Sequence, residues 1–270
     1  MPDLPALQRA RGAGRIAVAH ADGRTRLSRL YQDGCGKIRL PRDARAEGLE
    51  AVLINTSGGV TGGDALSWRA EAGDGARLTL TTQACEKVYR ARDGEAVIET
   101  TLSVGVGARI DWLPQETILF DGGRLRRRLQ ADLAPGARLL AVEAAILGRA
   151  AMGETVRAGA LADRWRIRRE GRLVFADDLR LDGAIAETGA ERPVLAGAQA
   201  FASILLVDDE AGRFLAPLRA ALGPAGGASA FDGKLFARLT APDGFSLRQA
   251  LLPALEALRG GAPLPRVWRT

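Results

Sequence analysis

The chain has 270 residues, 47% of them apolar and 26% charged, and a net charge of +6 at pH 7. This length supports one large domain with a sizeable core, so residues 1–270 are expected to form a single domain, with residues 1–28 as a mobile segment. The single histidine, His20, excludes a histidine triad and a zinc hydrolase site. Cys35 and Cys85 match no ligand spacing, which argues against a zinc site or a disulfide framework.

The apolar stretches of the sequence are short. Residues 139–142 and 144–147 are separated by a carboxylate, and no segment approaches the ~20 apolar residues that a membrane span needs. The first 23 residues lack the apolar core of a secretory signal. The sequence therefore predicts a cytoplasmic protein with no membrane partner.

The basic character of the chain comes almost entirely from arginine. Three of its 38 basic residues are lysines, at positions 37, 87 and 234, which leaves 35 arginines. A pI near 10.1 is typical of proteins that bind phosphate backbones. The arginines are spread along the chain, however, and aromatic residues make up only 5% of it, too few for an obvious base-stacking platform. We expect no nucleic-acid partner, although a basic, β-rich nucleic-acid-binding protein is the main alternative.

The segment NTSGGVTGGD, residues 55–64, follows the apolar run 51–54 and contains four glycines. It is not a phosphate-binding loop, because Asp64 stands where the lysine of that motif belongs. Ser57 and Thr61 lack a second histidine to act as their base. What remains is turn geometry, with Asp64 capping the turn or facing a cavity. An enzyme that uses Asp64 as a carboxylate base is a further, less favoured alternative.

Several segments share a glycine turn that leads into an alternating strand: GDGARLTL (73–80), GVGARIDW (105–112), PGARLLAV (135–142) and, more loosely, EGRLVFA (170–176). The equivalent positions are Leu78, Ile110, Leu139 and Leu173, with spacings of 32, 29 and 34 residues. This regularity predicts stacked β units of similar size, unless common turn chemistry produces it by coincidence.

Two arginine clusters lie in expected strands. Residues 164–177 read as a hairpin that turns at Glu170-Gly171, and period-two geometry places Trp165 and Ile167 on one face. The arginines of the first cluster lie on the other face: Arg164, Arg166 and Arg168. The second cluster consists of Arg126, Arg127 and Arg128, and the same two interpretations apply to both clusters. A solvated face is the plain interpretation, and a docking site for an acidic partner is the alternative.

Helical patterns appear only late in the chain. Ser246 and Gln249 have capping-box spacing, and apolar residues then recur at helical spacing until Gly260, with Pro253 as an expected kink. A weaker helical pattern covers residues 213–222. The sequence therefore predicts a mainly β protein of stacked strand units, a β-sandwich or β-helix-like scaffold, with a small C-terminal helical layer.

Some carboxylates interrupt apolar segments. Glu143 lies in RLLAVEAAILG, and alternation places it on one face with Leu139 and Ala141. A carboxylate in such a place is a surface residue, a member of a buried salt bridge with an arginine, or a group that faces an interior path. Asp177 ends the apolar strand RLVFA, and Glu154 follows a turn.

The ordered set of sequence blocks resembles the family of urease accessory proteins called UreD, or UreH in some bacteria. The blocks are NTSGGVTGGD (55–64), LTTQACEKVYRA (80–91), WLPQETILFDGGRLRR (112–127), AILGRAAMGE (145–154), DRWRIRREGRLVFADDLRL (163–181) and LPRVW (264–268). Each block is weakly specific, but the set covers the chain from about residue 30 to its end. The N-terminal segment departs from the family, because only Tyr31 is aromatic there.

The resemblance implies a maturation chaperone with no catalytic activity. Its implied partners are apo-urease, the accessory protein UreF and, through UreF, the GTPase UreG. Members of the family are expected to hold no cofactor tightly and to pass nickel(II) through an internal route. The resemblance assigns this transient nickel route to Asp64, Glu143 and Asp177, with Glu154 as a weaker member. The two arginine clusters are then candidate contacts for acidic UreF or urease.

Overall fold

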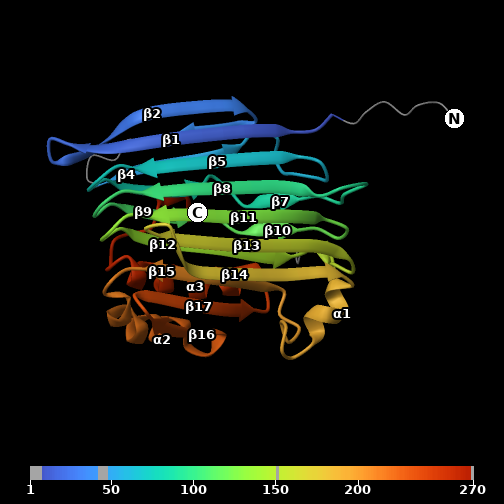
Figure 1. The fold of residues 1–270 in the computed structure, drawn as a ribbon. Helices are drawn as coiled ribbons and strands as arrows, with labels where there is room; N and C mark the ends of the chain where they lie inside the picture. The colour runs from blue at the N-terminus through green and yellow to red at the C-terminus, as the bar shows by residue number, and fades with distance from the viewer. Residues whose placement is uncertain (1–7, 42–47, 150–151, 269–270) are drawn as a thin grey trace.

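The computed structural model describes residues 8–41, 48–149 and 152–268. In this part of the chain, two sheets lie face to face and the chain passes repeatedly from one to the other (Figure 1). The first sheet has the strand order β2 (Arg24–Gly34), β1 (Arg11–Ala21), β5 (Ala65–Ala72), β8 (Ala96–Val104), β11 (Arg124–Leu133), β13 (Gly159–Arg169) and β14 (Arg172–Gly183).

The strands of the second sheet follow the same order, from the N-terminal end of the stack to its C-terminal end. Its order is β3 (Gly36–Arg39), β4 (Leu49–Asn55), β6 (Arg77–Thr82), β9 (Arg109–Leu113), β12 (Arg138–Leu147), β15 (Ala200–Val207), β17 (Lys234–Ala241) and β16 (Gly226–Phe231). Two short strands, β7 (Glu86–Val88) and β10 (Thr117–Leu119), pair with each other, and β10 also pairs with β12.

The strands from β4 to β13 form a β-helix-like winding. Successive long strands alternate between the sheets, and neighbours within each sheet are parallel. Leu78 is in register with Ile110, and Ile110 with Leu139. The predicted spacings of 32 and 29 residues are therefore the lengths of true coils, and the β-helix-like class is confirmed.

The fourth predicted repeat, 170–176, is wrong. Glu170 and Gly171 both have positive φ, at 50° and 76°, and they reverse the chain within the first sheet. This places Leu173 in β14, antiparallel to β13 and 48% exposed. The predicted hairpin turn at Glu170-Gly171 is confirmed, and it is this turn that ends the coil pattern.

Parallel pairing stops at the ends of both sheets. In the first sheet β2 pairs antiparallel with β1, and β14 with β13. In the second sheet β3 pairs antiparallel with β4, and β15 with β12. Thus each parallel stack is bordered by an antiparallel strand on both sides.

Two apolar cores lie on opposite faces of the second sheet. The interior between the sheets includes Leu139 and Ala141, whereas Leu140 and Val142 pack with the helices on the outer face. The helical elements are α1 (Ile185–Ala190), α2 (Leu215–Leu222), α3 (Gly244–Leu258) and the 3-10 turns η2 (Ala211–Phe214), η3 (Gly223–Ala225) and η4 (Arg266–Trp268). Because β12 is buried on both faces, its sequence is a nearly continuous apolar run.

The positions of the two C-terminal helices were predicted correctly, but the capping residue of α3 was not. In α3 the predicted apolar positions, such as Leu247 and Leu251, are buried. Its cap is Asp243, whose Oδ1 accepts a hydrogen bond from the Ser246 backbone N–H at 2.8 Å. The predicted capping role of Ser246 is therefore wrong, because the helix begins two residues before it. The short helix α1 had no predicted counterpart.

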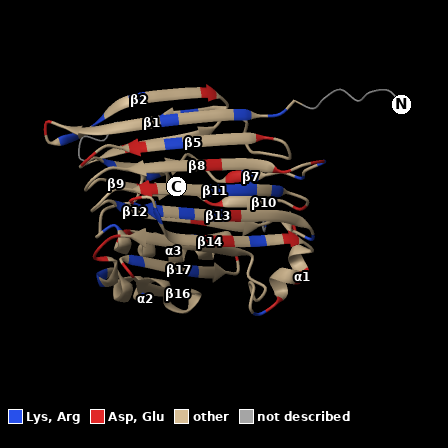
Figure 2. Ribbon diagram, viewed as in Figure 1, with Lys and Arg blue, Asp and Glu red and all other residues tan. Residues whose placement is uncertain are grey.

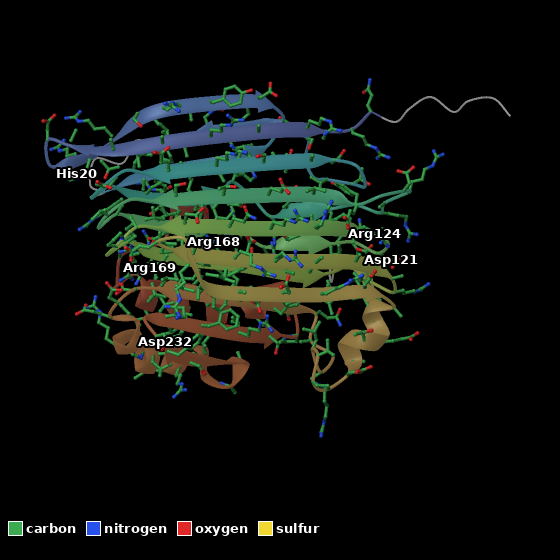
Figure 3. All side chains as sticks on the ribbon, in the orientation of Figure 1. His20, Asp121, Arg124, Arg168, Arg169 and Asp232 are labelled. Atoms are coloured by element: carbon green, nitrogen blue, oxygen red, sulfur yellow. The ribbon has the colours of Figure 1, made fainter. Side chains whose placement is uncertain are left out.

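The N-terminal part of the described chain forms regular β-strands. Residues 11–21 and 24–34 make β1 and β2, where the sequence suggested a mobile segment up to residue 28. His20 lies exposed near the end of β1 (Figure 3). Within the described residues, no helix is both long and apolar enough to cross a membrane.

Candidate functional site

The two edges of the coils differ in their connections. On one edge, four-residue turns join the strands: 73–76, 105–108 and 134–137. On the other edge the connections are longer, at 56–64, 83–95, 114–123 and, in its described parts, 148–149 with 152–158. Asp121 lies on this loop edge, at the right in Figure 3. Because binding sites in coiled repeats commonly lie on the side with the longer loops, the loop edge is the candidate functional face.

The glycine loop 55–64 packs tightly against the neighbouring loop of this edge. Val60 and Val88 form an isolated parallel bridge, and the Asn55 Nδ2 group donates to the carbonyl of Gly59 at 3.2 Å. A Cβ on Gly59 would lie 2.4 Å from the Tyr89 ring, and one on Gly62 would lie 2.0 Å from the carbonyl oxygen of Asp93. The glycines therefore permit close approach of two backbones, as predicted from the turn chemistry.

We expect the substitution Gly62→Ala to lower the free energy of unfolding by about 3 kcal/mol, because backbone atoms of residue 93 must move to admit the methyl group. Gly58→Ala is the matched control. It has open space around its Cβ but a φ of 78°, so it should cost about 1 kcal/mol. Urea unfolding of both variants tests this, and equal losses would show that close packing does not restrict the loop.

Asp64 holds the end of the glycine loop. Its carboxylate accepts backbone hydrogen bonds from Ala10 at 2.7 Å and Thr61 at 2.8 Å, one on each oxygen. The side chain thus caps the turn and ties it to the residue before β1. Both oxygens are engaged by backbone donors, so the geometry gives no support to Asp64 as the base of an enzyme.

Glu143 lies in the interior between the sheets and is paired across it. Its Oε2 is 2.5 Å from Nη1 of Arg127, which comes from β11 of the opposite sheet. Its Oε1 accepts a hydrogen bond from Nε1 of Trp112 at 2.9 Å. Arg127 also contacts Asp163 Oδ2 at 2.7 Å, and the other oxygen of Asp163 accepts from Nε1 of Trp165 at 3.1 Å. The predicted alternative of a buried salt bridge with an arginine is therefore confirmed.

The interior cluster has two carboxylates and one guanidinium. Burial raises the pKa of Glu143 to about 7, against the opposing effect of Arg127, and the nearby charge of Asp163 also raises this pKa. The Nε group of Arg127 is buried with no hydrogen-bond partner among the described residues. Glu143 is therefore a carboxyl group that can gain or lose a proton near neutral pH inside the protein.

Arg127 is not available to a partner, which corrects its assignment to a docking surface. Only 5% of it is exposed, because alternation along β11 turns it inward with Leu125 and Leu129, while Arg126 and Arg128 face outward. Period-two alternation thus places the middle arginine of this run on the opposite face from its two neighbours.

Asp177 makes a second connection between the sheets. It lies on β14, and its carboxylate is 2.6 Å from Nη2 of Arg238 on β17, in the other sheet. Nearby, the Phe175 and Phe236 rings pack at 5.1 Å between centroids. Glu143 and Asp177 therefore both connect the two sheets through an arginine, but only Glu143 is fully buried, whereas 19% of the Asp177 side chain is exposed.

Glu86 is an interior acid that the sequence reasoning missed. It is in register with the buried Thr117, and Val88, two residues later, is part of the core. The Asn55 Nδ2 group lies 3.1 and 3.3 Å from its two oxygens. Burial raises the pKa of Glu86 to about 7, against the smaller effect of this hydrogen bond. Its sequence context, QACEKVY, contains no continuous apolar run that would indicate burial.

Other buried acids join the second sheet to α3. Glu116 pairs with Arg248 at 2.7 Å, and Asp111 pairs with Arg259 at 3.0 Å. The thiol of Cys85 donates to Glu116 at 3.5 Å, and burial, followed by the charge of Glu116, raises the pKa of this thiol to about 11. Cys85 is thus held as a neutral thiol, which argues against a role as a reactive nucleophile.

The four acids of the predicted nickel route do not form one cluster. Glu143 and Asp177 connect the two sheets, whereas Asp64 and Glu154 lie on the loop edge; Glu154 pairs with Arg149 at 2.7 Å. In the described residues, no three groups from Asp, Glu, His and Cys are placed to hold a metal ion together. Any cation would therefore meet these acids one or two at a time.

The outward arginines share the outer face of the first sheet with acids. Figure 2 shows basic and acidic positions together along β11, β13 and β14. Arg126 pairs with Glu95 at 2.8 Å, and Arg164 and Arg166 pair with Asp178 at 2.6 and 2.5 Å. Arg128 and Arg168 lie on the same face, Arg128 with only a 3.5 Å contact to Glu99. This mixture of charges is unlike the continuous positive stripe of a nucleic-acid-binding surface.

The chain matches a known family over nearly its whole length. The family model described as UreD urease accessory protein matches residues 10–269. A urease accessory protein UreD of Rhizobium leguminosarum bv. trifolii is 55% identical over 262 residues, covering 97% of this chain and 96% of its own length. Those of Agrobacterium fabrum and Sinorhizobium medicae are each 53% identical, covering 97% of this chain and 92% and 96% of their own. The chain therefore belongs to the UreD family of urease accessory proteins.

Proposed function

We propose that this protein is a non-catalytic scaffold that joins apo-urease to UreF, and through UreF to the GTPase UreG, and passes nickel(II) through the interior between its two sheets. Membership of the UreD family gives the coarser part of this role, which is urease maturation. The nickel is cargo, and no tightly held cofactor is part of the proposal. The interior acids support nickel passage, and the arginines on the outer face of the first sheet support partner binding.

The observation that carries the nickel proposal is the buried Glu143–Arg127–Asp163 cluster in the interior between the sheets. A divalent cation that leaves water needs other ligands in place of its hydration shell, and these two carboxylates offer oxygen ligands. Arg127 competes for the same oxygens, so the affinity of the cluster for the cation is low. A Glu143 pKa of about 7 also allows the arriving cation to replace a proton at little cost.

Interior acids on either side of this cluster extend the route. Glu86 lies toward the loop edge, and Asp177 lies where β14 faces β17. Asp64 and Glu154 are weaker members of the proposed route, because backbone donors and Arg149 already engage their oxygens. We therefore assign the main passage role to Glu143 and Asp177.

The partner surface is proposed for the outer face of the first sheet. Its outward arginines are Arg126, Arg128, Arg164, Arg166 and Arg168. Arg168 makes no ion pair within the described residues, and Arg128 makes only a long one, so these two side chains can meet carboxylates of an acidic partner without breaking strong contacts. Charges on such a rim affect association rate and partner choice more than affinity.

The nickel proposal is tested by co-expressing apo-urease and the accessory proteins with the variants Glu143→Gln and Asp177→Asn. Both substitutions keep the size of the side chain and remove its charge, so we expect intact complexes but a several-fold lower nickel content of urease. Glu187→Gln is the control, because Glu187 is an exposed acid of α1 that belongs neither to the proposed route nor to the proposed partner surface. Full nickel content in both variants, measured by metal analysis of purified urease, would reject the passage assignment.

A further inference from the structure

The loop edge has an open cavity, and of its lining residues the proposed nickel route includes only Glu154, as a weaker member. Its volume is about 590 Å³. Three loops form it, and they contribute Tyr89, Phe120 and Glu154 respectively, among other residues. Its charged lining consists of Arg90, Arg149 and Arg157 with the acids Asp121 and Glu154. The lining thus carries one more positive than negative side chain.

The two acids of the cavity are already engaged. One oxygen of Asp121 accepts backbone hydrogen bonds from Arg157 at 2.9 Å and Ala158 at 3.2 Å, and the other lies 2.5 Å from Nη2 of Arg90. These backbone hydrogen bonds, with the charge of Arg90, lower the pKa of Asp121. Glu154 accepts from Nε of Arg149 at 2.7 Å and from its Nη2 at 3.2 Å, which lowers the pKa of Glu154. Both acids therefore stay ionised and have little capacity left to accept hydrogen bonds.

The arginines, in contrast, keep unused donors. A guanidinium has five N–H groups. Arg90 uses one of its nitrogens on Asp121, and Arg149 uses two on Glu154. The side chain of Arg157 makes no hydrogen bond or ion pair within the described residues. The cavity therefore presents a surplus of charge-assisted donors, which is the requirement for holding an oxyanion.

An apolar wall lies beside these donors. The Tyr89 and Phe120 rings meet edge to face at 5.2 Å, and the guanidinium of Arg149 lies 4.4 Å from the centre of the Phe120 ring. Phe120 itself is only 8% exposed, so the accessible apolar surface comes from Tyr89, which is 41% exposed, and from Met152, which is next to the lining residue Gly153 and 72% exposed. A ligand can thus place a short apolar stem on this wall while its anionic group meets the arginines.

We propose that this cavity binds a carboxylate carried on a short apolar stem. A carboxylate has one negative charge, which matches the single excess positive charge of the lining. A phosphate has a charge of about −1.5 to −2 at pH 7 and would be repelled more strongly by the two ionised acids. The planar carboxylate also fits the paired N–H groups of a guanidinium.

The proposal is tested by methyl NMR of the full chain, because Met152 is one of only two methionines and the other is Met1. Butyrate is the carboxylate probe and inorganic phosphate the competitor probe. We expect butyrate to shift the Met152 methyl signal in a saturable manner, with the Met1 signal unchanged. Arg157→Gln should raise the Kd for butyrate about tenfold, because a charge-assisted hydrogen bond is lost.

The control variant is Arg172→Gln, which removes an exposed arginine beside the turn at 170–171 and should leave the Kd unchanged. A Met152 signal that does not saturate with butyrate, or a Kd unaffected by Arg157→Gln, would overturn the proposal. Tighter binding of phosphate than of butyrate would overturn the choice of a carboxylate. Since neither urease nor nickel is present in this experiment, its outcome does not depend on the nickel proposal.

Discussion

Replacing Arg127 with alanine is expected to lower the free energy of unfolding by about 3–5 kcal/mol, the largest effect of any single substitution considered for this protein. The guanidinium lies between Glu143 and Asp163, and all three side chains are at least 92% buried. Without Arg127, two carboxylates remain close together in the apolar interior with no cation. One of them must then take up a proton or be solvated at the expense of packing.

Arg128→Ala is the matched control for this substitution. Arg128 is the next residue of the same strand, faces outward and is only 3.5 Å from Glu99, so its loss should cost less than about 0.5 kcal/mol. Urea unfolding at pH 7 measures both variants. If Arg127→Ala unfolds at the same urea concentration as Arg128→Ala, the interior ion pairs do not stabilise the fold.

The second large effect is a loss of stability as the pH rises from 5 to 8. The pKa of Glu86 and that of Glu143 are both about 7 in the folded protein, against an ordinary value of 4.5. Their protonated forms are favoured by folding, so this contribution is fully present below about pH 4.5 and is lost as the pH rises through 7. Asp121, Glu154 and Asp178 have lowered pKa values and stay ionised throughout this range.

The substitution Glu86→Gln removes the contribution of Glu86 to this pH dependence and leaves that of Glu143 in place. Its neutral amide needs no proton, so the variant should be more stable than the parent at pH 8, by about 1–3 kcal/mol, and should show a smaller loss of stability between pH 5 and 8. Glu71→Gln, at an exposed position of β5, should leave the pH dependence unchanged. Unfolding curves at several pH values test this, and a Glu86→Gln variant with the parent's slope would contradict the raised pKa.

The coil architecture could be predicted because it leaves a local pattern. A turn of Gly-x-Gly-Ala or Pro-Gly-Ala type precedes Leu78, Ile110 and Leu139, and the small alanine of each turn is buried. The same pattern failed at Leu173, because a glycine turn does not itself specify whether the next strand crosses to the other sheet. The positive φ of Glu170, a residue that seldom adopts it, made the difference there.

The interior ion pairs could be predicted only in part. The position of Glu143 in an apolar run indicated burial, but its partner Arg127 lies in another sheet, and Asp163 lies twenty residues further along the chain. Such contacts depend on the register between coils, which the sequence of a single chain does not give. The cavity around Arg157 has the same origin, since three separate loops form it.

The antiparallel strands that border each stack have a consequence for solubility. A parallel β stack grows by adding one more coil, so a bare terminal coil is a template for a second molecule and, through it, for fibrils. Here β2 and β14 run against the direction that such growth requires. The reversal breaks the translational repeat at both ends, which favours discrete particles over filaments when the chain is produced at high concentration.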